Sequence, residues 1–118
     1  MKKKILIVED DQALNDAFSL ILENTYDVDT AFDGKEALAL VDQKAYDLIL
    51  LDLLMPVMDG KEFLRSFENP KHIPVIVFSN LDAKSDIEDV TELGATRYML
   101  KSWASPKELI KLVQDTLA

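Results

Sequence analysis

The 118-residue chain contains no cysteine, which excludes disulfide bonds, thiol catalysis and thiolate metal sites. It has only three glycines and four prolines, so its composition is neither fibrous nor of low complexity. No apolar segment approaches the length that crosses a bilayer. The apolar run after the N-terminal lysines covers only 5–8, which is too short for a signal peptide. We therefore expect a cytoplasmic protein without membrane association.

Basic residues are scarce relative to acidic ones. The chain contains 13 Lys and Arg residues and 22 Asp and Glu residues, so its net charge is −9. A surface of this charge repels the phosphates of nucleic acids, and direct nucleic-acid binding by this chain is not expected. The length and a hydrophobic fraction of 48% predict a single domain over residues 1–118 with one core.

Short apolar stretches alternate along the chain with amphipathic ones. The pattern predicts strands over 3–8, 26–31, 47–51, 73–78 and 96–100, and helices over 12–24, 33–43, 83–93 and from 104 or 105 to 117, with a further helix that carries Phe63, Leu64 and Phe67 and stops before Pro70. The strands 48–51 and 75–78 are apolar throughout, which is typical of a parallel sheet covered by helices on both faces. We expect an α/β fold of the (βα)5 type, a three-layer sandwich.

Polar residues stand at the ends of four of these strands. Glu9, Asp10 and Asp11 follow the first strand, and Asp52, Ser79 and Lys101 follow the third, fourth and fifth. Taken alone, each has an ordinary structural explanation: Asp11 is expected to cap the helix that follows it, Asp52 would be a turn residue, Ser79 a loop hydroxyl and Lys101 a solvated charge. In a parallel sheet, however, all of these strand ends lie on one edge, where ligands bind.

Several carboxylates at one edge would repel one another unless a cation lay between them. With oxygen ligands only, and no Cys or His nearby, Mg²⁺ is the expected ion, and it commonly binds phosphate oxygens as well. The pattern therefore predicts phosphoryl chemistry.

Three segments carry a family resemblance. Residues 5–11 (ILIVEDD), 47–60 (DLILLDLLMPVMDG) and 98–101 (YMLK) resemble the receiver domains of bacterial two-component response regulators, the CheY-like superfamily. The resemblance extends over the whole chain, and the motif at 47–60 is its most specific part. It implies a flavodoxin-like fold with strand order 2-1-3-4-5.

The resemblance also implies a role for each acid. Asp52 would accept a phosphoryl group from a phosphohistidine of a sensor histidine kinase or a histidine phosphotransfer protein, forming an acyl phosphate. Asp10 and Asp52 would bind Mg²⁺ directly, Glu9 would act mainly through water, and the backbone carbonyl of Leu54 would complete the protein ligands.

The remaining residues would convert the modification into a signal. Lys101 and Ser79 would contact phosphoryl oxygens, and Ser79 and Tyr98 would act as switch residues that alter the surface of the fourth helix, fifth strand and fifth helix. That surface would meet a downstream target or an attached output domain, and a phosphorylation-dependent homodimer is left open. Such a domain assists its own phosphorylation and dephosphorylation but is not otherwise an enzyme.

The chain departs from the family pattern at several positions. Ser102 follows Lys101 where most receivers have proline, and a cis peptide without proline would cost about 2.5–4 kcal/mol. Asn80 replaces a residue that is usually small and predicts slower phosphorylation. Leu54 and Leu81 cannot orient an attacking water, which predicts slow autodephosphorylation.

Two alternatives remain. A phosphohydrolase of the haloacid dehalogenase type also uses an aspartate at a strand end, but it needs a second acid two residues later, where this chain has Leu54. A pseudo-receiver that acts as a docking module without phosphorylation is favoured by Ser102 and Asn80 and opposed by the presence of Asp52 and Lys101.

Overall fold

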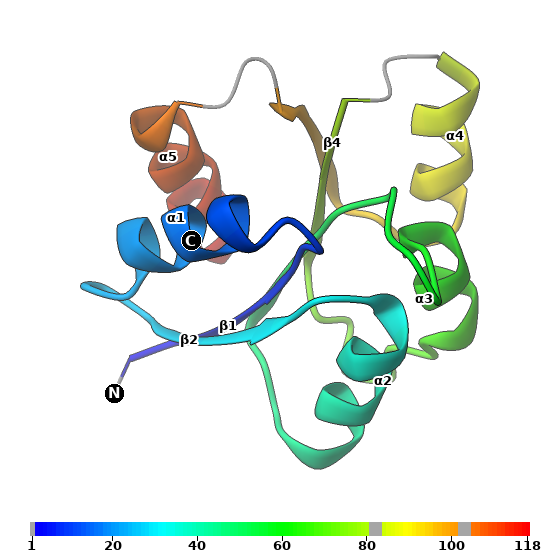
Figure 1. Ribbon diagram of the computed structural model, residues 1–118, viewed down its shortest axis with the longest axis horizontal. Helices are drawn as coiled ribbons and strands as arrows, with labels where there is room; N and C mark the ends of the chain where they lie inside the picture. Colours follow the sequence, from blue (N-terminus) through cyan, green and yellow to red (C-terminus); the bar gives the residue numbers. More distant parts are fainter. Residues whose placement is uncertain (1, 81–83, 102–104) are drawn as a thin grey trace.

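The computed structural model describes residues 2–80, 84–101 and 105–118, which form a central parallel sheet flanked by helices (Figure 1). The strands, listed in chain order, are β1 (Lys4–Val8), β2 (Asp27–Ala31), β3 (Leu48–Leu51), β4 (Val75–Ser79) and β5 (Arg97–Leu100). Their order in the sheet is β2-β1-β3-β4-β5, and every neighbouring pair is parallel. The expected α/β class and flavodoxin-like strand order are confirmed.

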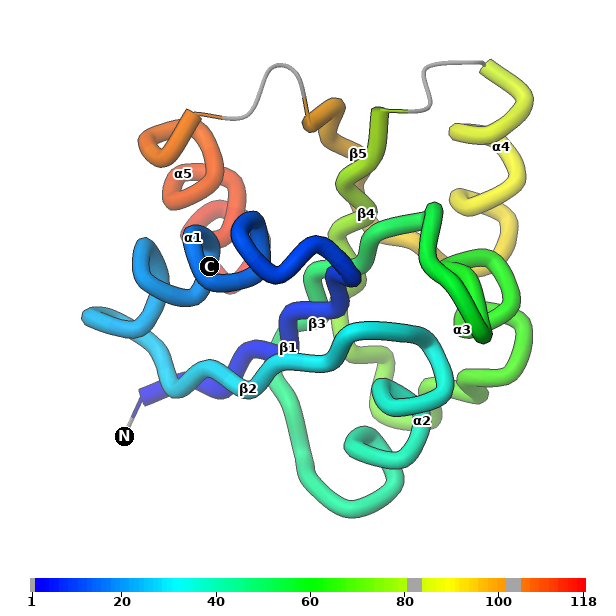
Figure 2. The backbone as a smooth tube through the Cα atoms, viewed as in Figure 1, coloured from blue at the N-terminus to red at the C-terminus, as the bar shows by residue number. Residues whose placement is uncertain are grey.

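Five helices connect or follow the strands. They are α1 (Gln12–Leu22), α2 (Gly34–Gln43), α3 (Gly60–Ser66), α4 (Lys84–Glu92) and α5 (Pro106–Leu117). The backbone trace shows α1 and α5 on one face of the sheet and α2, α3 and α4 on the other (Figure 2). The molecule therefore has the three layers expected of it, and no described helix has both the length and the apolarity required to traverse a membrane.

The alternation of side chains along β1 explains why its sequence is continuously apolar. Leu6 and Val8 pack into the core under α2, α3 and α4, whereas Ile5 and Ile7 pack into the core under α1 and α5. All four side chains are fully buried. Burying each contributes about 1.5–3 kcal/mol, so both faces of the strand stabilise the sheet.

Acidic or hydroxyl side chains cap the starts of four helices. The caps of α1, α2, α3 and α5 are Asp11, Asp33, Asp59 and Ser105, and each side chain accepts a hydrogen bond from the backbone N–H three residues later. Such a cap satisfies an N–H that has no partner within the helix. The capping role expected of Asp11 is confirmed.

Some predicted boundaries were wrong by one or two residues. α1 ends at Leu22 rather than residue 24, because the N–H groups of Thr25 and Tyr26 both donate to the carbonyl of Leu22. β4 begins at Val75 rather than at residue 73, because the side chain of Asn69 binds both the N–H and the carbonyl of Ile73. The expected helix starts at 83 and 104 lie outside the described residues.

Candidate functional site

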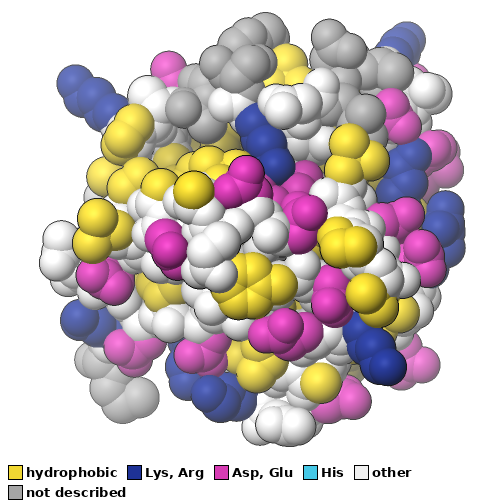
Figure 3. Space-filling view, viewed as in Figure 1, with side chains coloured by type: hydrophobic (Ala, Val, Ile, Leu, Met, Phe, Trp, Pro, Cys, Tyr) yellow, Lys and Arg dark blue, Asp and Glu magenta, His cyan; other side chains and the backbone are white. Residues whose placement is uncertain are grey.

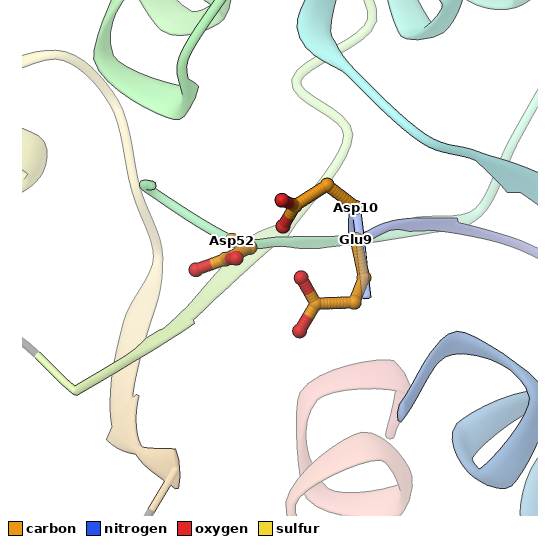
Figure 4. A group of neighbouring side chains, drawn as sticks. All are labelled: Glu9, Asp10 and Asp52. Atoms are coloured by element: carbon orange, nitrogen blue, oxygen red, sulfur yellow. The ribbon is translucent and has the colours of Figure 1, made fainter. Parts of the chain in front are cut away.

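The carboxyl ends of β1 and β3 bring three acids together. Glu9 and Asp10 leave the end of β1 and Asp52 the end of β3, and the three side chains gather at one point (Figure 4). Each offers an oxygen within 4.8 Å of the other two. Glu9 and Asp52 are buried and Asp10 is exposed. Backbone hydrogen bonds from Asp52 to the carbonyl of Val8 and from Glu9 to that of Ala31 hold these strand ends in register.

Lys101 supplies a positive charge to this cluster from the end of β5. Its Nζ donates to Glu9 Oε1 at 2.6 Å and to Asp52 Oδ2 at 3.0 Å. Burial alone would lower the pKa of Lys101, but the hydrogen bond to Glu9 and the charge of Asp52 outweigh it and raise that pKa. Acidic side chains gather beside a Lys or Arg side chain on the face seen in Figure 3. The ammonium thus neutralises part of the repulsion between the acids.

Glu9 has a second carboxylate oxygen that Lys101 does not contact. Its Oε2 is buried and has no hydrogen-bond partner among the described residues. Burial raises the pKa of Glu9, and the neighbouring Asp52 carboxylate acts in the same direction, while Lys101 opposes both by stabilising the charged form. A buried oxygen without a partner, beside two other carboxylates, fits a hard divalent cation, which prefers oxygen ligands.

Ser79 and Lys101, the two predicted phosphoryl contacts, lie on the same edge of the sheet, and the predicted switch residue Tyr98 lies on β5. Ser79 ends β4 and is buried, and it pairs in register with Leu100, the residue before Lys101. Tyr98 lies two residues earlier than Leu100 on β5, half-buried against the core under α2, α3 and α4. The sheet therefore brings Ser79 to the edge that carries Asp52 and Lys101.

The loop from β3 to α3 begins at Asp52 and contacts it twice. The backbone N–H of Leu54 lies 3.4 Å from Asp52 Oδ1, while the Leu54 side chain is exposed. A Cβ on Gly60 would collide with the carbonyl oxygen of Asp52, so only glycine lets α3 begin this close to the site. Asn80 is exposed, whereas Leu81 and the peptide bond from Lys101 to Ser102 lie outside the described residues.

Two residues at the site were not anticipated from the sequence. The amide of Asn15 is buried, and its Nδ2 donates to the carbonyl of Glu9 at 2.9 Å, which orients the end of β1. The sequence did contain an indication of this role, because Asn15 is a polar residue on the otherwise apolar face of α1. Phe78 places its ring under the Lys101 ammonium, 5.5 Å from Nζ to the ring centroid. No sequence pattern predicts that a residue of β4 contacts a lysine that follows β5.

Comparisons with known proteins agree with this geometry. The family model described as response regulator receiver domain matches residues 5–114. A CheY-like receiver domain protein from Methanospirillum hungatei JF-1 is 28% identical, with a TM-score of 0.93 over 99% of this chain and 94% of its own. The receiver domain of the Francisella response regulator 1452 is 35% identical, with a TM-score of 0.86 over 98% and 96%. The chemotaxis protein CheY4 of Vibrio cholerae is 30% identical, with a TM-score of 0.92 over 99% and 100%.

The buried acids at the ends of β1 and β3, the lysine at the end of β5 and the order of the strands occur here together with a family match over nearly the whole chain. The chain therefore belongs to the response regulator receiver domain family, whose members are signalling domains of two-component systems rather than conventional enzymes.

Proposed function

We propose that Asp52 accepts a phosphoryl group from the phosphohistidine of a sensor histidine kinase or a histidine phosphotransfer protein. One carboxylate oxygen of Asp52 forms the new bond to phosphorus, the N–P bond of the donor breaks, and the donor imidazole leaves with a proton. One observation carries the proposal: the oxygens of Glu9, Asp10 and Asp52 lie within 4.8 Å of one another, with the Lys101 ammonium 3.0 Å from Asp52. Positioned charge of this kind is the main requirement of phosphoryl transfer.

We further propose Mg²⁺ as the cofactor. Asp10 and Asp52 would bind it directly, Glu9 would act mainly through water, and the backbone carbonyl of Leu54 would complete the protein ligands. When bound, the ion neutralises negative charge on the transferring group. The all-oxygen donor set and the unpartnered Oε2 of Glu9 support this assignment.

Lys101 and Ser79 then bind the phosphoryl oxygens. The ammonium of Lys101 exchanges a carboxylate oxygen for a phosphoryl oxygen, while Ser79 donates its hydroxyl to another. The buried position of Ser79 at the end of β4, beside the residue that precedes Lys101, supports this role. In a buried environment these contacts are stronger than they would be in water.

The modification becomes a signal through the surface of α4, β5 and α5. A phosphoryl group adds about −1.5 to −2 charges, which draws Ser79 toward it and changes the rotamer of Tyr98. Val90 is the only buried residue of α4, so this helix can shift at low cost. The altered surface engages a downstream protein target or an attached output domain. We infer that residues 1–118 act as one receiver domain in the cytoplasm.

The test is phosphorylation of the purified chain by acetyl phosphate with Mg²⁺, followed by intact mass measurement. We expect one added phosphoryl group on the wild type, none on Asp52→Asn, and none when EDTA removes the metal. Asp59→Asn is the matched control, because Asp59 lies in the same loop and caps α3, and it should still be phosphorylated. An unmodified wild type that binds Mg²⁺ would instead support the docking module. Equal modification of the wild type and Asp52→Asn would refute the assignment of the acceptor.

A further inference from the structure

The Lys101 ammonium contacts an aromatic ring as well as two acids. Nζ lies over the face of Phe78, 5.5 Å from the ring centroid. A cation within about 6 Å of a ring centroid is attracted by the negative face of the ring, most strongly where water is excluded. The Phe78 side chain is fully buried and that of Lys101 is 19% exposed. The contact therefore lies in an environment where such attraction is significant.

The ring is held firmly in place. Phe78 lies on β4 directly before Ser79, and its side chain belongs to the core under α1 and α5. The ring of Phe18 on α1 packs against it in a T-shaped arrangement, with centroids 4.9 Å apart and planes at 80°. Because a close-packed ring cannot move independently of the sheet, its face is a fixed reference point for the ammonium.

We propose that Phe78 is a positioning residue that keeps the Lys101 ammonium at the site when the carboxylates no longer hold it. The inference rests on the proposed function. Once a cation engages Glu9 and Asp52, the hold of both carboxylates on Lys101 is weakened, before any phosphoryl oxygen on Asp52 can replace them. The attraction to the ring does not depend on the charge of either acid.

A lysine needs such a restraint because of its chain. Four rotatable bonds separate the backbone from Nζ, and fixing them costs up to about 2 kcal/mol of side-chain entropy. The Phe78 face limits the positions available to the ammonium, so that a phosphoryl oxygen on Asp52 lies within its reach.

The test replaces Phe78 by phenylalanines that carry one, two or three ring fluorines. Fluorine withdraws electron density from the ring face while changing the volume of the side chain very little. We expect the rate of Asp52 phosphorylation by acetyl phosphate to fall stepwise with each fluorine, to roughly one-fifth of the wild-type rate or less for the trifluorinated ring. The matched control is the same series at Phe18, which packs against Phe78 but is not part of the lysine contact, and there the rate should not change.

A rate that is independent of fluorination at Phe78, or that falls equally in the Phe18 series, would overturn the inference. Rescue separates the ring from simple packing: Phe78→Tyr should retain the wild-type rate, while Phe78→Leu should lose at least as much as the trifluorinated ring.

A second measurement keeps this inference distinct from the proposed function. In the metal-free protein, NMR should find the ε-methylene protons of Lys101 shifted upfield by the ring, a shift lost in Phe78→Leu and kept when the trifluorinated ring replaces Phe18. A wild type that shows this shift but is never phosphorylated refutes the acceptor role and leaves the contact established. A missing shift in the wild type refutes the contact itself.

Discussion

Lys101 donates to the buried carboxylate of Glu9 at 2.6 Å, although the two residues are 92 positions apart in the sequence. With its second bond to Asp52, the lysine acts as a cation built into the acidic cluster. The metal-free protein therefore tolerates buried acids that would otherwise repel one another. A divalent ion that binds the same acids must compete with this ammonium.

Removing the lysine should destabilise the metal-free protein. Lys101→Met leaves the nearly fully buried side chains of Glu9 and Asp52 without a cation, and breaking such a buried pair typically costs about 3 kcal/mol. Urea unfolding in EDTA measures the loss, and saturating Mg²⁺ should recover part of it. Lys107→Met, at an exposed position of α5, is the control and should unfold like the wild type. Coincident unfolding curves for the two variants would contradict the role given to Lys101.

A second charged network predicts the pH dependence of stability. Burial opposes ionisation of Asp29, but hydrogen bonds from Tyr46 at 2.8 Å and from Lys44 outweigh it and lower the pKa of this carboxyl below its ordinary value of 3.8. Because the folded state then binds fewer protons than the unfolded state, the network stabilises fully above about pH 4 and is lost as pH falls through the lower, folded pKa.

Asp29→Asn should therefore lower the free energy of unfolding by about 1 kcal/mol between pH 5 and 7, since the pair is partly exposed. Chemical denaturation at a series of pH values measures the difference from the wild type, which should shrink below pH 4. Asp27→Asn, an exposed position on the same strand, should show no such difference. A gap that persists at pH 3 would refute the network.

The loop after Asp52 contains a strained residue. Val57 has φ of +68°, a left-handed conformation that is unfavourable for a β-branched side chain, and its side chain is 76% exposed. Val57→Gly should raise the free energy of unfolding by about 1 kcal/mol, because glycine adopts this conformation without strain and no buried contact is lost. Thermal unfolding checks this. Val57→Ala, which keeps a Cβ, should recover less, and a destabilised glycine variant would show that the loop is not strained here.

One lysine of α3 connects two helices. Lys61 Nζ lies 2.9 Å from Asp86 Oδ1 and 3.2 Å from Asp89 Oδ2, both on α4. Lys61→Met should speed amide hydrogen exchange throughout α4, since Val90 is the only buried residue of this helix. The global free energy of unfolding should change by less than about 1 kcal/mol.

Lys84→Met is the matched control for this connection, because Lys84 is 91% exposed and its ion pair with Glu88 lies within α4. It should leave exchange near wild-type rates. Equal protection of α4 in the Lys61 and Lys84 variants would show that the connection between α3 and α4 carries no stability.

Local sequence determined the elements and the kind of site. The apolar runs at 48–51 and 75–78 predicted strands buried on both faces, and the acid at Asp11 predicted the start of α1. These features depend on side-chain periodicity and on caps within a few residues, which a single sequence displays directly. Placing Asp52 and Lys101 on one edge required only that the strands be parallel.

Tertiary structure decided which of these side chains touch. The strand order came from a family resemblance, since alternating strands and helices fit several orders. The bonds from Lys101 to Glu9, the ring of Phe78 under the same ammonium, and the Lys61 connection to α4 join residues from separate elements. The later start of β4 likewise depends on a side-chain conformation, because the Asn69 amide binds both backbone groups of Ile73. Such contacts depend on strand neighbours and rotamers, which are set when the core packs and leave no periodic trace in the sequence.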